Sequence, residues 1–154
     1  MNLTPHVQGL LAKPVMIHLA TSNERHEVAT TIFVAAAPGE DPAILRLFIP
    51  QVSLGAGQRP ILAHEEAAVS ITEVLEYTSL QLKGRLVTLR PATPDEQAIQ
   101  REMSERFVAL DYPEKLLSMS QTPLVTAEVR VREIYDQTPG PGAGRLLADE
   151  GIAC

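Results

Sequence analysis

Residues 78–90, with the sequence TSLQLKGRLVTLR, form the longest strand candidate in the chain. Alternate positions carry apolar or small residues and the positions between them carry polar ones: Leu80, Leu82, Gly84 and Leu86 against Gln81, Lys83 and Arg85. Side chains alternate between the two faces of a strand, so this period of two predicts one buried and one open face. Gly84, on the apolar side, indicates a bend, a β-bulge or a close approach by another group.

Five further segments alternate in the same way or have the β-branched composition that is typical of strands. They are Val15 to Thr21, Val28 to Ala36, Ile44 to Ile49, Val69 to Thr72 and Leu124 to Ile134. The regular alternation of strands and helices expected for a doubly wound parallel sheet is missing. The sequence therefore predicts a mainly β protein with six antiparallel strands, and closure into a barrel would remove the aggregation-prone edges.

Short helices are predicted around these strands. Thr4-Pro5 is expected to start one that reaches Ala12, and Gln58 to Glu66 is expected to form another, with Pro60 in its first turn. Thr93-Pro94-Asp95-Glu96 has the pattern of a capping box and predicts a helix that Pro113 interrupts. Glu114 to Met119 adds one or two turns, and the Pro/Gly-rich segment Gln137 to Gly144 is expected to end the regular structure.

Length and composition indicate a single domain over residues 1–154, with residues 1–13 as an N-terminal segment and 137–154 as a tail. The formal net charge of -6 argues against binding to nucleic acid or to an anionic membrane. The single cysteine, Cys154, excludes an intramolecular disulfide and fits a reducing cytosol. The sequence contains neither a membrane-spanning apolar run nor a signal peptide, so we expect a soluble, cytoplasmic protein.

The segment Leu54 to Pro60, with the sequence LGAGQRP, is the most suggestive candidate for an anion site. Glycines let main-chain amides converge, a helix start adds its positive dipole end, and Arg59 can bind a phosphate in a bidentate manner. The dinucleotide fingerprint fits poorly because Pro60 occupies the third glycine position and no βαβ unit surrounds it. Taken alone, the residues are also compatible with a plain loop.

Other chemistry has little support in the sequence. The four histidines, His6, His18, His26 and His64, show no metal-ligand spacing, so no metal site is predicted. No Gly-x-Ser-x-Gly nucleophile elbow occurs. The segment Thr138 to Gly144 lacks the Lys-Ser/Thr of a phosphate loop and is expected either to cover a ligand or neighbouring subunit or to be a disordered tail.

Taken together, the order of these elements resembles the pyridoxamine 5′-phosphate oxidase-related family of FMN-binding split barrels, over about Val15 to Gly144. The resemblance is carried by two leading strands, the stretch LRLFIP at 45–50, the Gly-rich link, AVSI at 68–71, LQLKG at 80–84 and the closing QTPGPGAG at 137–144. It implies a six-stranded antiparallel split β-barrel of Greek-key type with a few short peripheral helices. The closing stretch is similar to the tail of an uncharacterised subgroup.

The resemblance also implies FMN as cofactor, held at the interface of a homodimer. The family's phosphate-binding Ser-Arg-Lys segment falls on Gly57-Gln58-Arg59, so only Arg59 keeps a basic side chain. The remaining implied contacts come from the strand positions Thr30, Thr31, Phe48 and Ile49, from the flavin-edge positions Thr78 and Ser79, and from Gln81 and Lys83. The family's C-terminal substrate-binding Arg and His are not recognisable, and no catalytic residue is predicted.

Three hypotheses follow. The first is an FMN-dependent oxidoreductase that acts on a small-molecule substrate, with the isoalloxazine ring supplying the hydride chemistry. The second is a non-catalytic protein that carries a flavin or haem, with His18 or His64 as an axial ligand. The third is a purely structural domain. For Gln81, Lys83 and Arg85, a solvated barrel exterior competes with a flavin edge at a dimer interface.

Overall fold

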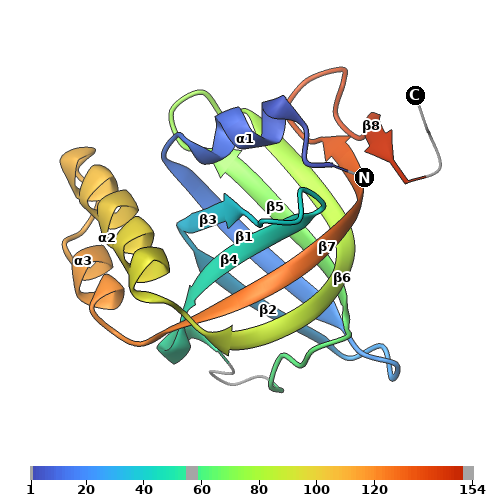
Figure 1. Ribbon diagram of the computed structural model, residues 1–154. Helices are drawn as coiled ribbons and strands as arrows, with labels where there is room; N and C mark the ends of the chain where they lie inside the picture. Colours follow the sequence, from blue (N-terminus) through green and yellow to red (C-terminus); the bar gives the residue numbers. More distant parts are fainter. Residues whose placement is uncertain (1, 55–58, 151–154) are drawn as a thin grey trace.

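The chain folds into one strongly curved antiparallel sheet (Figure 1). The structure is a computed structural model that describes residues 2–54 and 59–150. Within these residues the sheet has eight strands in the order β2-β1-β5-β6-β7-β4-β3, with β8 paired to β7. The strands are β1 (Val15–Ser22), β2 (Val28–Phe33), β3 (Ala35–Pro38), β4 (Ile44–Pro50), β5 (Glu66–Glu73), β6 (Ser79–Pro91), β7 (Leu124–Asp136) and β8 (Leu146–Asp149). Mainly antiparallel β structure is therefore confirmed, but the predicted number of six strands is wrong.

The two ends of the sheet path, β2 and β3, are consecutive in the chain, and Val34 alone separates them. β2 pairs with β1, whereas β3 pairs with β4 on the opposite side. The main chain itself therefore bridges the split in the barrel, and residues 33–36 are all buried because the chain turns inward there. This crossing is why the predicted single strand Val28 to Ala36 is divided in two.

The barrel interior holds the main apolar core. Alternate residues of every long strand point inward, and α1 (Pro5–Leu11) lies across the upper end of the barrel in Figure 1. Thr4 caps this helix, accepting from the Val7 amide at 3.4 Å, as the Thr-Pro start predicted. The largest fully buried aliphatic side chains of the core include Ile17, Leu19, Leu45, Leu47, Ile71, Leu80, Leu82 and Leu86.

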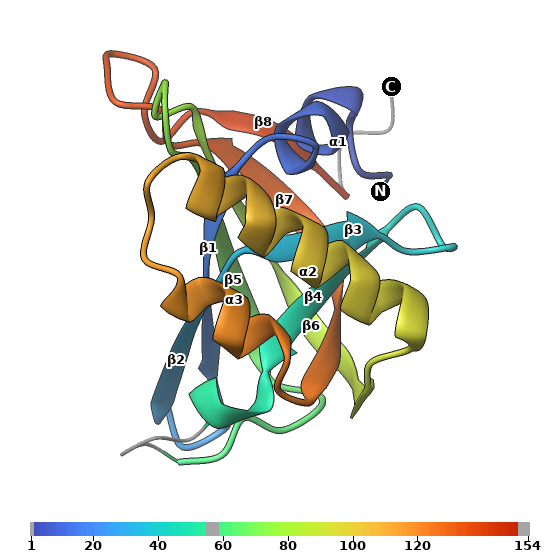
Figure 2. The same cartoon turned by 90° about the vertical axis from the view of Figure 1, so that its left-hand side faces the viewer.

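A second apolar cluster lies between the barrel and two helices, α2 (Pro94–Ala109) and α3 (Lys115–Ser120), which lie side by side in Figure 2. Both halves of the predicted capping box are present, since Thr93 accepts from the Glu96 amide and Glu96 accepts from the Thr93 amide. Phe107 packs edge-on against Tyr112 beneath the helices, with the ring centroids 4.9 Å apart. Among the described residues, no helix is long and apolar enough to cross a membrane.

Two further predicted features are wrong. Residues 59–65 form no helix, because their backbone groups pair with β6 instead: the His64 amide donates to the Leu86 carbonyl at 2.6 Å and the Leu86 amide donates to the Glu65 carbonyl at 2.9 Å. The Pro/Gly segment does not end the regular structure, because it turns the chain back to form β8. Gly144, at φ 86°, donates to the Asp136 carbonyl at 2.7 Å and closes that turn.

A short 3-10 helix, Gln51–Ser53, follows β4 and was not predicted. It lies next to the split in the barrel, where the Thr31 hydroxyl donates to the Ser53 carbonyl at 3.3 Å. This bond ties β2 to the segment after β4 and so holds the two sides of the split together.

Candidate functional site

Much of the outer face of β2, β1, β5, β6 and β7 is left uncovered by the described helices, since α1 lies over the barrel end and α2 contacts β3 and β4. Strand register places its side chains in two complete rungs. One rung runs Ile32, His18, Ser70, Gln81 and Tyr135, and the next runs Thr30, Ala20, Ala68, Lys83 and Glu133. Predicted site residues from β2 and β6 thus share one face.

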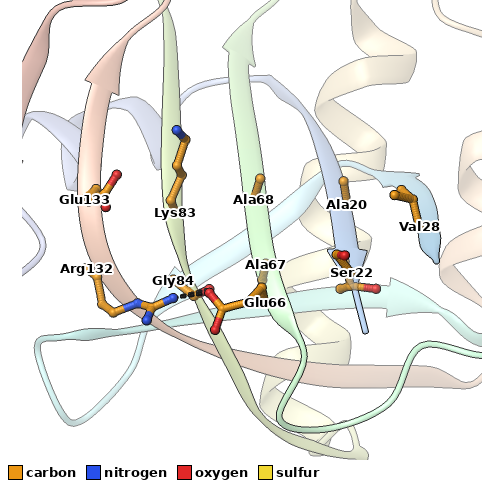
Figure 3. A pocket seen from close by; sticks show the side chains of 11 residues that line it. Ala20, Ser22, Val28, Glu66, Ala67, Ala68, Lys83, Gly84, Arg132 and Glu133 are labelled. Atoms are coloured by element: carbon orange, nitrogen blue, oxygen red, sulfur yellow. Dashed lines mark hydrogen bonds and ion pairs between the residues drawn. The ribbon is translucent and has the colours of Figure 1, made fainter. Parts of the chain in front are cut away.

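A hollow of about 310 Å³ lies on this face (Figure 3). Its floor lies close to the main chain of the sheet, because Ala20 and Ala68 carry a single methyl group and Gly84 carries none. Charged side chains surround this floor: Lys83 and Glu133 from β6 and β7, and Arg132 with Glu66. The combination of small apolar floor and charged rim makes this hollow the candidate functional site.

A β-bulge places two neighbouring side chains of β7 at the hollow. Lys83 pairs with Glu133 and Gly84 pairs with Val131, so Arg132 has no partner on β6. Val131 and Ile134 are buried, whereas Arg132 and Glu133 both lie partly exposed on the outer face. Simple alternation would have turned one of the two inward. Bulges commonly re-aim side chains in this way next to functional sites.

The charges of the hollow are not equally available to a ligand. Arg132 forms an ion pair with Glu66 and also donates to the Gly84 carbonyl at 3.3 Å. Glu133 accepts from the Tyr135 hydroxyl at 2.6 Å, and this bond to a carboxylate raises the pKa of Tyr135. Lys83 makes no ion pair with any described residue, and its ammonium lies 4.5 Å from the centre of the Tyr135 ring. Lys83 is therefore the cation best placed to bind an added anion or carbonyl.

A second hollow, of about 590 Å³, adjoins the first and shares Ser22 and Glu66 with it. His26 and His64 line it, and both have left-handed backbone conformations, with φ of 60° and 71°. In the parts of the chain that the structure describes, no group of three or more His, Cys, Asp or Glu side chains is arranged to hold a metal ion.

The predicted site residues do not all come together. Thr30, Gln81 and Lys83 lie on the outer face, Thr30 and Lys83 exposed and Gln81 half-buried. The side chains of Thr31, Phe48 and Ile49 are buried, so they can reach a ligand on this face through main-chain atoms at most. Gly57 and Gln58 lie outside the described residues.

Thr78 and Ser79 lie at the far end of the face from Arg59. Ser79 pairs with Thr72, which pairs with Met16, whereas Arg59 contacts Thr21. The five residue steps from Met16 to Thr21 span roughly 16 Å at the usual strand rise. Ser79 is also engaged within the protein, since its hydroxyl lies 2.8 Å from that of Thr72 and its amide donates to Thr138. A single small group cannot touch both ends.

The guanidinium of Arg59 is fully hydrogen-bonded within the protein. Its guanidinium donates to Glu65 at 2.6 Å and to the main-chain carbonyls of Glu27, Pro60 and Thr21. These contacts account for all five of its N–H groups. The Glu65 side chain is 5% exposed and the Arg59 side chain 17%, so the pair is largely buried. The structure gives Arg59 a role in fixing the loop before β5, and its contact with a phosphate stays a prediction.

Sequence reasoning missed several residues of the hollow: Ala20, Ala68, Glu66, Arg132 and Glu133. The two alanines looked like ordinary strand residues, because only the register shows that they are neighbours. Arg132 was expected to alternate with Val131, and nothing in the sequence gave the position of the bulge on β7. Gly84 was the one available signal, since a glycine on the apolar face indicated a bulge or a close approach.

The fold and the site together define a split barrel with an open, hollowed outer face. HupZ of Group A Streptococcus has a similar structure: the TM-score is 0.52, at 11% identity, and the match covers 92% of this chain and 99% of that chain. Together with the curved antiparallel sheet, this likeness supports the split-barrel fold that the resemblance implied. No family model matches the sequence, and no curated protein matches it.

Two further solved structures align less closely. One is HutZ, described as the heme storage protein from Vibrio cholerae, with a TM-score of 0.49, 12% identity and coverage of 88% of this chain and 95% of that chain. The other is a pyridoxamine 5′-phosphate oxidase-related, FMN binding protein from Nostoc punctiforme, with a TM-score of 0.43, 16% identity and coverage of 82% and 76%.

Proposed function

We propose that this protein binds FMN on the outer face of its barrel, between two copies of the chain, and acts as an FMN-dependent oxidoreductase on a small-molecule substrate. The observation that carries the proposal is the hollow with Ala20, Ala68 and Gly84 as its floor and with Lys83, which makes no ion pair with a described residue, at its rim. The sequence resemblance supplies the identity of the cofactor.

The residues of the hollow fit a flavin in two respects. Short side chains let a planar ring approach the sheet closely, and Lys83 can donate to a carbonyl or phosphate oxygen of the cofactor. Gln81 and Thr30 lie on the same face and can add hydrogen bonds to a polar ring edge. When bound, FMN would supply the hydride chemistry, and the protein would supply position and hydrogen bonds.

The proposed arrangement needs a second copy of the chain, because the hollow would cover only one side of a planar ring. Two large apolar side chains of β2 lie exposed on the same face, Val28 at 61% and Ile32 at 46%. Covering them against a partner would remove apolar surface from water, as homodimer interfaces usually do. The homodimer is thus part of the same proposal.

Flavin titration of a Lys83→Ala variant tests the proposal. We expect saturable quenching of FMN fluorescence by the natural protein and a dissociation constant about tenfold higher for K83A, the usual effect of losing a hydrogen bond to a charged group. Lys115→Ala is the matched control, since Lys115 is exposed on α3, and it should bind FMN like the natural protein. Equal affinity of K83A and the natural protein would remove Lys83 from the site, and absence of saturable quenching would refute flavin binding.

Arg59→Ala separates the structural and phosphate-binding roles of that residue. Because Arg59 neutralises the buried Glu65, its loss should lower the midpoint of urea unfolding by leaving a carboxylate without its partner. If R59A instead loses FMN affinity markedly while its urea midpoint is unchanged, Arg59 contacts the phosphate and has no large structural role.

Haem carriage is a second candidate because His18 is exposed on the same face, between Ile32 and Ser70 in its rung. An exposed imidazole on an uncovered face can reach a haem iron. A Soret band after haem addition that His18→Ala abolishes would favour this function over the first. Failure to bind either cofactor would leave a structural role.

A further inference from the structure

The outer face continues past the first hollow into the second one. In the strand register, Glu66 lies opposite Arg85, one rung beyond Ala68 on the same face (Figure 3). Arg85 therefore follows Lys83 on the outer face of β6, at roughly 7 Å along the strand. Glu66 and Ser22 line both hollows, and Arg85 lines the second. A ligand that lies on the alanine floor of the first hollow can thus extend to Arg85.

Arg85 has a guanidinium that the protein leaves open. Its Nε atom donates to the main-chain carbonyl of His64 at 2.8 Å, and this bond orients the group. Its two terminal amino groups make no hydrogen bond or ion pair with any described residue, although the side chain lines the hollow. Four of its five N–H groups are therefore available to a ligand. Arg85 has the free donors that Arg59 lacks.

Two histidines in the same hollow add further donors. The side chains of His26 and His64 are exposed and form neither a hydrogen bond nor an ion pair with the described residues. An imidazole carries at least one N–H donor in either protonation state. The main chain of His64 is held by its bond to Arg85, so this imidazole and the Arg85 guanidinium belong to one fixed corner of the hollow.

Most other charges of the second hollow already have partners. They form three ion pairs: Glu65 with Arg59, Glu66 with Arg132, and Arg25 with Glu27. Glu24, exposed in the connection between β1 and β2, is the one carboxylate of the described lining that forms no ion pair. A carboxylate next to its cation repels an added anion weakly, because the two fields largely cancel. The open guanidinium of Arg85 therefore suits this hollow to an anion.

We propose that the second hollow binds a phosphate group, held by the guanidinium of Arg85 and the imidazole of His64. Arginine binds phosphate through parallel charge-assisted N–H bonds, which are among the strongest hydrogen bonds in proteins. The inference deepens the proposed function and rests on it for the identity of the ligand: with the flavin ring in the first hollow, the adjoining one takes the phosphate of FMN. The phosphate contact then moves from Arg59 to Arg85. A phosphorylated substrate offers the same chemistry, and the experiments separate the two sources.

Comparison of FMN with riboflavin tests the cofactor as the source of the phosphate. Riboflavin has the same ring and ribityl chain but no phosphate, so the natural protein should bind FMN at least about tenfold more tightly, the usual effect of charge-assisted hydrogen bonds. Arg85→Ala should remove this preference and leave riboflavin binding unchanged, which also shows that R85A is folded. Arg85→Lys should keep part of the preference, because it keeps the charge but loses the planar fork. Arg101→Ala is the matched control, since Arg101 is exposed on α2 outside the hollow, and it should keep the whole preference.

Inorganic phosphate tests the site without a flavin. In protein labelled with ¹³C at the histidine side chains, titration with phosphate at constant pH and ionic strength should shift the imidazole signals of His26 and His64 saturably. His6 and His18 do not line the second hollow, so their signals should stay nearly unchanged. Arg85→Ala should abolish the shifts. A failure of the flavin proposal does not affect this result.

The outcomes assign the phosphate or overturn the inference. A preference for FMN that R85A loses assigns the phosphate to the cofactor. Shifts of His26 and His64 that R85A loses, without a preference for FMN, assign it to a substrate. If the natural protein shows neither effect, or if R85A keeps the effect that the natural protein shows, the second hollow is not a phosphate site of Arg85.

Discussion

Gly84 stands where the β6–β7 ladder skips a residue, and the absence of a side chain there is a geometric requirement. A Cβ atom at this position would collide with the main-chain carbonyl of Arg130, and backbone cannot move aside as a flexible side chain can. The same close approach lets the bulge at Arg132 form and so places Arg132 and Glu133 at the candidate site. One glycine thus supports both the barrel wall and the hollow.

Gly84→Ala is expected to lower the free energy of unfolding by more than about 2 kcal/mol, as overpacking against backbone usually does. Urea unfolding followed by circular dichroism measures the change. Gly9→Ala is the matched control: nothing lies within 4 Å of the position in α1, so alanine should stabilise the protein by about 0.5–1 kcal/mol through helix propensity. Equal midpoints for G84A and the natural protein would contradict the packing described for the bulge.

The first turn of α2 is joined to the sheet by a buried carboxylate. Glu96 is 1% exposed and receives hydrogen bonds from Arg46 at 3.0 Å and from Arg90 at 2.8 Å. The Thr93 amide and the Thr126 hydroxyl also donate to it, at 2.9 Å and 2.7 Å. Burial alone would raise the pKa of Glu96, but the bonds from Arg90, Thr93 and Thr126 outweigh it and lower the pKa to about 2. A helix cap therefore also serves as the attachment of α2 to β4, β6 and β7.

This attachment makes stability depend on pH. The pKa of Glu96 is lower in the folded state than its ordinary value of 4.5, so its contribution is complete above about pH 4.5 and is lost as the pH falls toward 2. The size of the shift corresponds to about 3 kcal/mol. Urea midpoints between pH 7 and pH 2 should show this loss.

Glu96→Gln should remove this loss of stability between about pH 4.5 and pH 2. It should also lower stability at pH 7, because Arg46 and Arg90 lose their shared carboxylate. Glu105→Gln, at an exposed position on the same helix, serves as the control and should follow the natural protein. A curve for E96Q that falls as steeply as that of the natural protein would assign the acid loss to other groups.

The molecule as a whole has one face that its helices do not cover. Antiparallel sheets often leave one face to water, but here that face carries Val28 and Ile32 exposed beside a floor of alanines. Small side chains permit a second surface to approach closely, which is why we place a second copy there. The helix α2 contacts β3 and β4, and the hollow with its floor of alanines stays open.

Ala68→Arg tests the proposed homodimer. A long charged side chain on the floor of the hollow should prevent close approach of two copies. We therefore expect the natural protein to sediment as a dimer and A68R to sediment as a monomer. Flavin binding should be lost with it. Ala98→Arg, at an exposed position on α2, is the matched control and should remain dimeric. Identical sedimentation of A68R and the natural protein would place the interface elsewhere or exclude it.

The sequence by itself determined six strand segments, with β2 and β3 taken as one and β8 missed, and two of the helix starts, because their signals are local. Alternation over residues 78–90 predicted β6, and the pattern from Thr93 to Glu96 predicted the capping box of α2. Gly84 was correctly expected at a bulge or a close approach. Such features depend on a few neighbours in the chain, and physical propensity is enough to find them.

The tertiary structure alone decided which residues meet. Ala20 and Ala68 become neighbours through strand register, Arg132 turns outward through a bulge, and Arg59 is neutralised by Glu65 rather than left free for a ligand. The helix predicted before β5 does not form, because His64 and Glu65 hydrogen-bond to the main chain of Leu86 on β6. Pairings between distant segments depend on the strand order and register of the whole sheet, and no local pattern records them.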